Sequence, residues 1–404
     1  MEKKLLTYTS YLYLVSYAFV VTSFGLCNKP IADAFNVGER SMGLLISTHY
    51  TGLVVMTVCA GFLADRIGLK PVMVGSVSFL GLSLIGLAKS WNTPSLFVMM
   101  LFTGFAGGAI ESTVNALISR LYSDTRTYSL NKLHIFFGVG AFTWPMIGGQ
   151  LLRAGVDWRL LFVVLGIFSL AMAVVIAFQE FPGHDRSEVI RFSEMFGLLK
   201  QPAMLIIGLL VALYAGAEMG INAWIVRYFE DELLNGSKVA MTIKAAFFSR
   251  HMALPVTTGL FLTLYWFSMT AGRLLVTIAG RRFPDYILLR ALTTCAAIAG
   301  LGIFITGNVI VAAVFLILTG FFFSGIFATS IAIGNNRFPS YAGSVSGIII
   351  AFSGVGNMAL NSGIGEISQR FGSIKAGMFF ASIMLIGMAA CSFAIRKDPV
   401  VKTI

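Results

Sequence analysis

Twelve apolar stretches, each about as long as a helix that crosses a lipid bilayer, dominate this 404-residue chain. Spanning the hydrocarbon core takes about twenty apolar residues, because each residue advances a helix by about 1.5 Å. The first six stretches fall near residues 9–29, 42–63, 71–88, 95–118, 131–152 and 158–179, and the next six near 203–226, 256–279, 286–306, 308–330, 343–364 and 374–394. The sequence therefore predicts an all-α membrane protein with twelve transmembrane helices.

A polar stretch between the sixth and seventh apolar runs divides the chain into halves. We expect an N-terminal six-helix bundle over residues 1–179, a cytoplasmic linker over 180–202 and a C-terminal six-helix bundle over 203–404. Most Lys and Arg residues lie in segments that share one side when the N-terminus is cytoplasmic, as basic loops of membrane proteins do. This predicts a multi-pass protein of the cell membrane with both termini cytoplasmic. The long outer loop, residues 227–254, has apolar residues at helical spacing and fits a surface helix or an ordered cap.

Composition excludes most other classes of protein. Only 12% of residues are charged and 57% are hydrophobic, whereas soluble domains carry about 25% charged residues. The net charge of +11 follows from basic cytoplasmic loops, so no nucleic-acid partner is expected, only the lipid bilayer. The four cysteines lie in or beside apolar runs without metal-ligand spacing. The sequence predicts no metal and no cofactor, and, because it has no nucleophile–base pair or phosphate loop, no enzyme.

The loop after the second apolar run carries a family signature, Gly61-Phe-Leu-Ala-Asp65-Arg66-Ile-Gly68-Leu-Lys70. Gly61 permits a close helix contact, Asp65 can pair with a cation or a helix N-terminus, and Gly68 allows a tight turn. Arg66 and Lys70 hold the loop on the cytoplasmic side. The run resembles the gating motif G-x-L-A-D-R-x-G-R/K-R/K of the major facilitator superfamily, and a degenerate copy follows the eighth run. The resemblance implies two related six-helix bundles around a central cavity, working by alternating access.

Three further segments narrow the resemblance to the fucose/galactose/glucose–proton symporter family. They are GGAIESTVN at 107–115, LNKLHIFFGVGA at 130–141 and LYAGAEMG at 213–220. This resemblance implies proton-coupled uptake of a sugar. We expect the protein to be a monomer. The same register places Gly25 where that family has a sugar-binding acid, with Asn28 as the nearest polar residue, and this argues against L-fucose itself.

Glu111 and Asn115 lie one helical turn apart in an apolar run, on one face of the predicted helix. An ionisable group at membrane depth costs free energy, about 2.5–3.5 kcal/mol on insertion scales, and normally faces an aqueous path or the bundle interior. Small residues before Glu111, among them Gly104, Gly107 and Gly108, would let a neighbouring helix approach closely. We expect Glu111 to carry the proton, while Asn115 either binds a solute hydroxyl or holds Glu111.

The seventh run repeats this pattern, since Tyr214, Glu218 and Asn222 follow at i, i+4 and i+8. Glu218 is a second candidate for proton coupling, and its alternative role is to pair with a basic residue that gates the halves. His134 is the third proton-coupling candidate, because imidazole titrates near neutrality, although a membrane histidine also serves as an interhelical hydrogen bonder. The remaining candidates for solute binding are polar groups at membrane depth: Asn28, His49, Asn131, Asn357 and Asn361. Asn131 could instead cap the start of its helix. Asn357 and Asn361 could instead serve the packing of one helix against another.

The residues and the resemblance together favour a secondary active transporter that couples protons to the uptake of a small polar solute, a sugar in particular. The main alternative is a proton-antiport exporter of drugs or metabolites. Its support is Pro145-Met-Ile-Gly148-Gly149, which resembles the end of the antiporter motif G-P-x-x-G-G, although Trp144 occupies a glycine position. A third possibility is a membrane sensor that transports nothing, ranked below both transporters because transporter-derived sensors usually carry a soluble extension.

Overall fold

The computed structural model describes residues 2–122, 125–181, 197–234, 259–279 and 282–395. The chain separates into two compact units, residues 1–189 with 257–259, and residues 190–256 with 260–404. The predicted 180–202 linker and 227–254 loop lie mostly outside the described residues. The helices of the first unit are α1 (Glu2–Leu26), α2 (Asn28–Phe35), α3 (Glu39–Ile67), α4 (Leu69–Ala88), α5 (Thr93–Leu121), α6 (Arg126–Arg153) and α7 (Trp158–Ala177).

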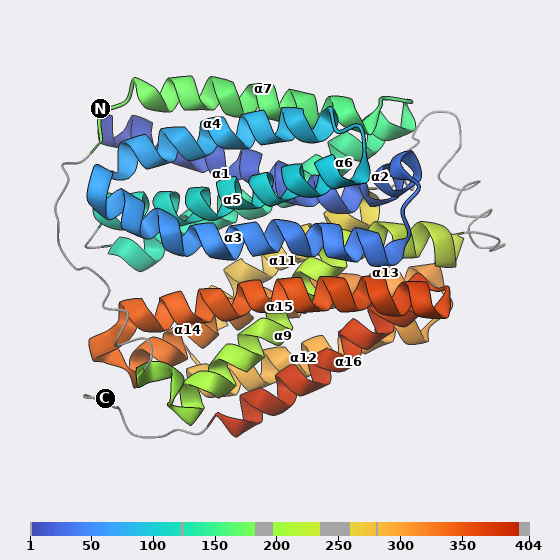
Figure 1. Cartoon of the computed structure of the whole chain (residues 1–404). Helices are drawn as coiled ribbons and strands as arrows, with labels where there is room; N and C mark the ends of the chain where they lie inside the picture. Colours follow the sequence, from blue (N-terminus) through green and yellow to red (C-terminus); the bar gives the residue numbers. More distant parts are fainter. Residues whose placement is uncertain (1, 123–124, 182–196, 235–258, 280–281, 396–404) are drawn as a thin grey trace, which may run out of the picture. The chain divides into compact units, whose positions relative to one another are not determined.

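All the secondary structure described in the second unit is helical (Figure 1). Its elements are α9 (Pro202–Tyr228), the π-helix η2 (Phe229–Leu234), α11 (Leu260–Ala279), α12 (Asp285–Ile305), α13 (Val309–Phe323), α14 (Ile326–Arg337), the 3₁₀ turn η3 (Pro339–Tyr341), α15 (Ala342–Phe371) and α16 (Ile374–Ala394). Among the described residues, 11 helical spans are long and apolar enough to cross a membrane, and a shorter apolar helix covers Leu260–Val276. All twelve predicted spans are therefore present.

Several boundaries differ from the prediction by a few residues, and three of the differences bear on the site. The first span ends at Leu26, and Asn28 begins the separate helix α2. The fifth span begins at Arg126 and not near residue 131, because the helix continues through polar residues that a hydropathy count leaves out. Asn131 thus lies in the second turn of α6 and does not cap it. The tenth span is broken into α13 and α14 at Ser324 and Gly325.

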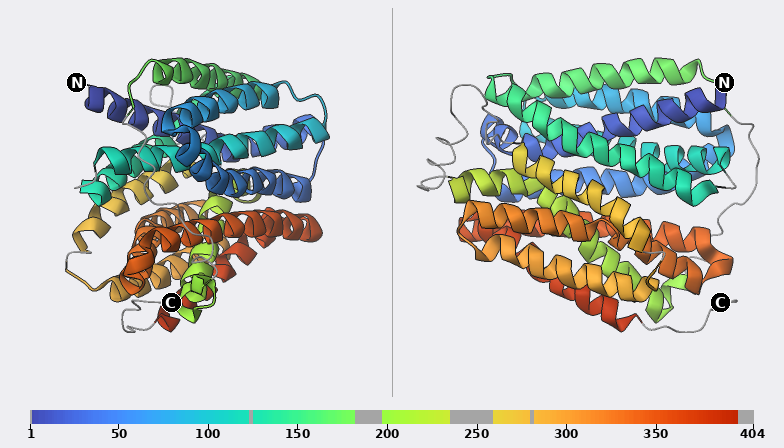
Figure 2. Two further views of the ribbon diagram at one scale, coloured as in Figure 1. Left: turned by 60° about the vertical axis from the view of Figure 1, so that its left-hand side comes forward. Right: turned by 180° about the vertical axis from the view of Figure 1, so that it is seen from behind.

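The two units repeat one pattern of helix pairing. In the first, α1 packs along α6, α3 along α5, and α4 along both α5 and α7, as the adjacent α4 and α7 ribbons show (Figures 1 and 2). In the second, α9 packs along α15, α11 along α13, and α12 along both α13 and α16. Counted by span, these are the same pairs: first with fifth, second with fourth, third with fourth and sixth. The repetition supports two related halves, as the degenerate motif copy indicated.

Glycines bring paired helices into backbone contact. A Cβ at Gly104 would collide with the carbonyl oxygen of His49 on α3, and one at Gly108 with that of Leu53. Facing them, a Cβ at Gly52 would collide with the carbonyl of Leu101 on α5. Lipid is as apolar as the side chains, so close backbone packing is a main force between membrane helices. The close approach predicted for this glycine-rich segment is confirmed.

Side chains cap several helix starts. Asn92 accepts a hydrogen bond from the amide of Ser95 at 2.9 Å and starts α5, whose second position is Pro94. Asn308 accepts from the amide of Ile310 at 2.9 Å and starts α13. Each cap satisfies backbone donors that the first helical turn leaves open.

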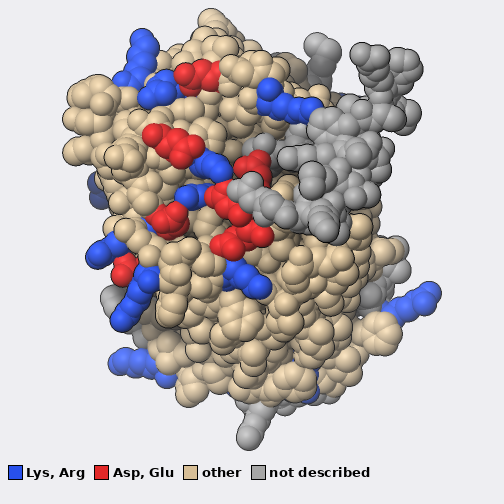
Figure 3. Space-filling view, turned by 90° about the vertical axis from the view of Figure 1, so that its right-hand side faces the viewer, with Lys and Arg blue, Asp and Glu red and all other residues tan. Residues whose placement is uncertain are grey.

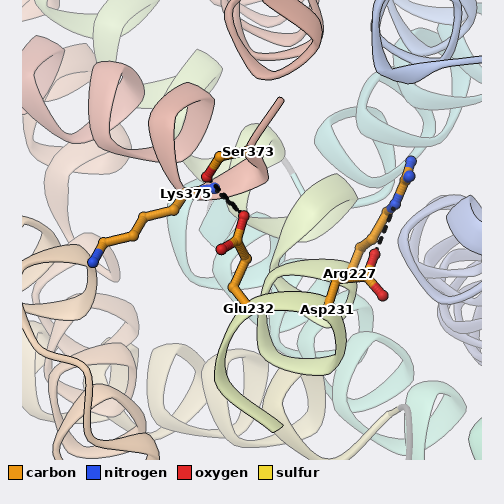
Figure 4. A network of polar contacts seen from close by, with 5 residues as sticks. All are labelled: Arg227, Asp231, Glu232, Ser373 and Lys375. Atoms are coloured by element: carbon orange, nitrogen blue, oxygen red, sulfur yellow. Dashed lines mark hydrogen bonds and ion pairs between the residues drawn. The ribbon is translucent and has the colours of Figure 1, made fainter. Parts of the chain in front are cut away.

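Both ends of α16 are held by charges from other helices of its unit. At its N-terminus, the carboxylate of Glu232, on η2, accepts hydrogen bonds from Ser373 Oγ at 2.7 Å and from the Lys375 amide at 3.3 Å (Figure 4). At its C-terminus, the Arg290 guanidinium, on α12, donates to the carbonyl of Ile395 at 3.0 Å. A negative group at the N-terminus and a positive group at the C-terminus both oppose the helix dipole.

We expect the alanine substitution at Gly108 to destabilise the protein and that at Gly75 to be harmless. A Cβ at position 108 would strike the backbone of Leu53 and Thr57, and such overpacking costs about 1–3 kcal/mol. Gly75 is exposed on α4 with nothing within 4 Å, and alanine there gains up to about 1 kcal/mol of helix propensity. Thermal unfolding in detergent measures both, and equal melting temperatures would contradict the close α3–α5 contact.

The two clamps on α16 should act independently. Glu232→Ala should lower the free energy of unfolding by about 1 kcal/mol and Arg290→Met by about 1–2 kcal/mol. The ends of this 21-residue helix lie about 30 Å apart, so the double variant should show the sum. Lys375→Gln is the matched control, because only the backbone amide of Lys375 joins the network. A coupling energy well above about 0.5 kcal/mol would show that the clamps are not separate.

Candidate functional site

A polar strip runs along the second half of α5 and stays partly exposed. Glu111, Ser112, Asn115 and Ser119 recur along one side of the helix, and all four are half-buried. The exposed residues of α4 and α7 in the same unit are apolar, as at Leu82 and Ile167. Apolar exposure suits lipid, whereas a carboxyl and an amide at membrane depth require water or protein.

Asn115 bonds within its own helix. Its Nδ2 donates to the backbone carbonyl of Glu111 at 2.8 Å. The bond therefore ties Asn115 to the Glu111 main chain and not to the carboxylate. Solute binding by Asn115 stays a prediction.

A tyrosine that the sequence analysis missed lies beside Glu111. Tyr17, on α1, is 3% exposed, and a Cβ at Gly107 would collide with its phenol oxygen. Glu111 and Tyr50 both interact electrostatically with this phenol. The spacing of Tyr13 and Tyr17, one turn apart in the first apolar run, was the signal that could have revealed a polar face on α1.

His49 lies fully inside the first bundle, between α3 and α5. Its Nδ1 lies 3.1 Å from the Thr103 hydroxyl, and its ring packs against Phe24 and Tyr50. This contact joins α3 to α5, so His49 has the role of an interhelical hydrogen bonder, the alternative given above for a membrane histidine. His134 is half-buried on α6, and Asn28 is buried at the start of α2. The side chain of Asn131 lies outside the described part of the structure.

In the second bundle, Tyr214, Glu218 and Asn222 are all buried along α9. Tyr265, on α11, donates to the backbone carbonyl of Glu218 at 3.5 Å, and the Trp266 indole donates to Asn222 Oδ1 at 2.9 Å. The α9 stripe therefore faces α11.

Arg273 and Glu218 share two phenols as neighbours. Both interact electrostatically with Tyr214 and with Tyr265. This places a cation from α11 in the surroundings of Glu218, as the alternative role for Glu218 requires. In the first bundle, the ionisable neighbours given for Tyr17 are an acid, Glu111, and two phenols.

The break between α13 and α14 lies next to this cluster. Phe323 and Phe327, on either side of the break, contact the ring of Tyr214 at centroid distances of 5.3 and 6.4 Å. Gly272, next to Arg273, faces Ser324, because a Cβ there would lie 2.7 Å from the serine Oγ. Discontinuous membrane helices often line the solute sites of transporters. The sequence analysis missed this break, although Ser324-Gly325 within an apolar run was its signal.

Asn357 and Asn361 lie on α15, buried in the second bundle. The Asn361 amide donates to the Asn357 backbone carbonyl at 2.9 Å. Among the described residues, neither side-chain carbonyl oxygen has a hydrogen-bond donor. Each amide therefore keeps an acceptor available.

The predicted gating motif forms the turn between α3 and α4. Gly68 joins the helices with φ +92°, a conformation that glycine adopts readily, so the predicted turn is confirmed. The close contact predicted for Gly61 is wrong, since a Cβ there would meet nothing within 4 Å. Arg66 is exposed and Lys70 half-buried, whereas the Asp65 side chain lies outside the described residues. In the described residues, no three His, Cys, Asp or Glu gather as metal ligands.

Figure 3 shows one face of the molecule, on which uncharged side chains cover most of the drawn surface and Lys, Arg, Asp and Glu are confined to limited areas. The view looks along the helices at their ends, which are the parts of a membrane protein where charged loops meet water.

Comparisons with known proteins agree with this architecture. The model of the Major Facilitator Superfamily matches residues 10–360. Protein TsgA of Salmonella paratyphi B is 23% identical over 361 residues, covering 87% of this chain and 85% of that protein. The nucleoside transporter NupG has the same fold, with a TM-score of 0.78 at 13% identity over 98% of this chain and 99% of that one. The fucose:proton symporter FucP of E. coli has a TM-score of 0.65 at 16% identity, over 98% and 99%.

These findings identify a membrane transporter and not an enzyme. The chain belongs to the Major Facilitator Superfamily, as the motif between α3 and α4 indicated. Its twelve spans and repeated helix pairing are the fold of that family.

Proposed function

We propose that this transporter couples proton movement to the uptake of a small polar solute, in particular a sugar, by alternating access. The observation that carries the proposal is the half-buried polar strip on α5, of which Glu111 is the first residue. A carboxyl group kept partly exposed at membrane depth can exchange its proton with water and meet a solute in the same place.

The buried amides of the second bundle suit a ligand with several hydroxyls. Amides both donate and accept, and Asn357 and Asn361 each keep a carbonyl oxygen without a donor among the described residues. The folds of FucP and NupG, described as a fucose:proton symporter and a nucleoside transporter, lend support by likeness of fold alone. Glu111 acts as the proton carrier in this scheme, with Glu218, His134 and the amides as further members of the route.

The proposal includes the predicted organisation of the chain. Residues 1–179 and 203–404 form the two moving bundles, residues 180–202 link them in the cytoplasm, and both termini are cytoplasmic. The protein works as a monomer in the cell membrane, with Gly61–Lys70 as a gating loop. Asn28, His49, Asn115, Asn131, Tyr214 and Asn222 remain the other proposed solute contacts.

Export by proton antiport is the second candidate, because Gly148 and Gly149 are buried against neighbouring residues as a motif of close helix packing requires. Trp144 weakens it: the indole donates to Ser23 on α1 at 2.6 Å and stacks on Phe19 at 4.9 Å. The position where the antiporter motif has glycine therefore holds a fixed bulky side chain.

We expect Glu111→Gln to abolish accumulation driven by a pH gradient and to leave solute exchange at least partly intact. Glutamine keeps the size and polarity of the side chain but carries no proton. The measurement uses proteoliposomes with an imposed pH gradient and radiolabelled D-galactose or D-glucose, beside counterflow without a gradient. Glu366→Gln, at an exposed position on α15, is the control. Unchanged gradient-driven uptake in Glu111→Gln would remove Glu111 from the mechanism.

Overexpression in cells separates import from export. Import predicts raised accumulation of labelled sugar that a protonophore collapses, with no change in tolerance of lipophilic cations. Raised resistance to such cations without sugar accumulation would favour the antiport alternative. A thermal-shift screen of the purified protein against sugars, polyols, organic acids and amphipathic cations identifies the ligand class, since selective binding stabilises the folded state.

A further inference from the structure

A tyrosine on α1 holds a buried phenol oxygen that lacks a hydrogen bond. Tyr17 is 3% exposed, and its hydroxyl has no partner among the described residues. Tyr13, one turn earlier, is 0% exposed and interacts with Ser76. Leaving a buried hydroxyl unsatisfied lowers stability, and native proteins keep few such groups. For Tyr17 the neighbourhood supplies a reason, because an ionisable carboxyl lies close to it.

The geometry directs Glu111 toward the phenol of Tyr17. The phenol oxygen rests on Gly107, where any side chain would collide with it. Glu111 follows one turn later on α5, and helical side chains lean toward the N-terminus, over the preceding turn. The carboxyl of Glu111 therefore leans over the position that the phenol occupies, and the two groups interact electrostatically.

We infer that Tyr17 is a positioning residue for Glu111, whose carboxylate accepts a hydrogen bond from the Tyr17 phenol after Glu111 has released its proton. The phenol keeps its own proton throughout, so the only proton that moves is that of Glu111. When Glu111 is protonated again, the carboxyl no longer needs this donor and the phenol returns to its unbonded state. Tyr17 thereby sets the pH at which Glu111 is recharged, an inference that rests on the proposed proton-carrying role of Glu111.

This pair has other charged or titratable groups on its own helices and on the helices packed against them. Its own helices contribute Tyr13 on α1 and Arg120 near the end of α5, and α3 contributes Tyr50. His49, also on α3, is engaged with Thr103. From α6 come His134 and Lys132, whose ammonium lies 5.6 Å from the ring centroid of Tyr11, and from α4 only Lys70 at its start. Within the described residues, Tyr17 is the phenol that stands against the turn preceding Glu111.

Infrared titration tests the inference without any solute. The protonated carboxyl band of Glu111 is identified as the one that Glu111→Gln removes, and its amplitude is followed against pH in purified protein. Tyr17→Phe should move the midpoint of this band upward by about one to two pH units, because a hydrogen bond from the phenol stabilises the charged carboxylate. The melting temperature should stay the same or rise, since the variant removes a hydroxyl that has no partner.

Tyr13→Phe is the matched control, on the same helix and equally buried, and its midpoint should equal that of the unaltered protein. An unmoved midpoint in Tyr17→Phe, or an equal shift in both variants, overturns the inference. The proposed function is judged separately by Glu111→Gln in gradient-driven uptake. Retained uptake there, together with a shifted band in Tyr17→Phe, would refute the proton-carrying role and leave the pairing of Tyr17 with Glu111 standing.

Discussion

Close backbone contact between helices is the constraint on which the first bundle depends. Helices in lipid gain nothing by hiding apolar side chains from each other, so they associate by packing and by hydrogen bonds. Gly52 on α3 and Gly104 and Gly108 on α5 let the two backbones touch. The contact of its glycine face with α3 fixes the orientation of α5 about its own axis. In this orientation Glu111 and Asn115 lie on the partly exposed side of the helix.

The number and type of the elements followed from the sequence, because each span is an apolar run of the length that a bilayer demands. Hydropathy says nothing about where a helix continues into polar residues, and so it missed the start of α6 at Arg126. A hydropathy average over about twenty residues also passes over the break at Ser324 and Gly325, because the residues on both sides of it are apolar. The turn at Gly68 was predictable, since its chemistry is local.

The site was predictable as a set of polar residues but not as a set of neighbours. Glu111 and Glu218 look alike in the sequence, as acids with an amide one turn later. In the structure Glu111 is half-buried beside a phenol from α1, whereas Glu218 is 8% exposed in a cluster that includes Arg273 from α11. Tyr17 and Arg273 both lie on other helices, so no sequence pattern within α5 or α9 predicts these neighbours.

This difference bears on which acid carries the proton in the scheme proposed above. A carboxyl beside a guanidinium is favoured in its charged form, and it gives up that charge only when the cation is moved or neutralised. The neighbour that the structure shows for Glu111 is the Tyr17 phenol, so in the inferred pairing protonation of Glu111 gives up a hydrogen bond and not an ion pair. A proton carrier has to change between its charged and neutral forms in every transport cycle. In this scheme the free energy needed for that change is smaller for Glu111 than for Glu218. Glu218 is then better suited to hold α9 and α11 together through its phenol-rich cluster than to load and unload a proton.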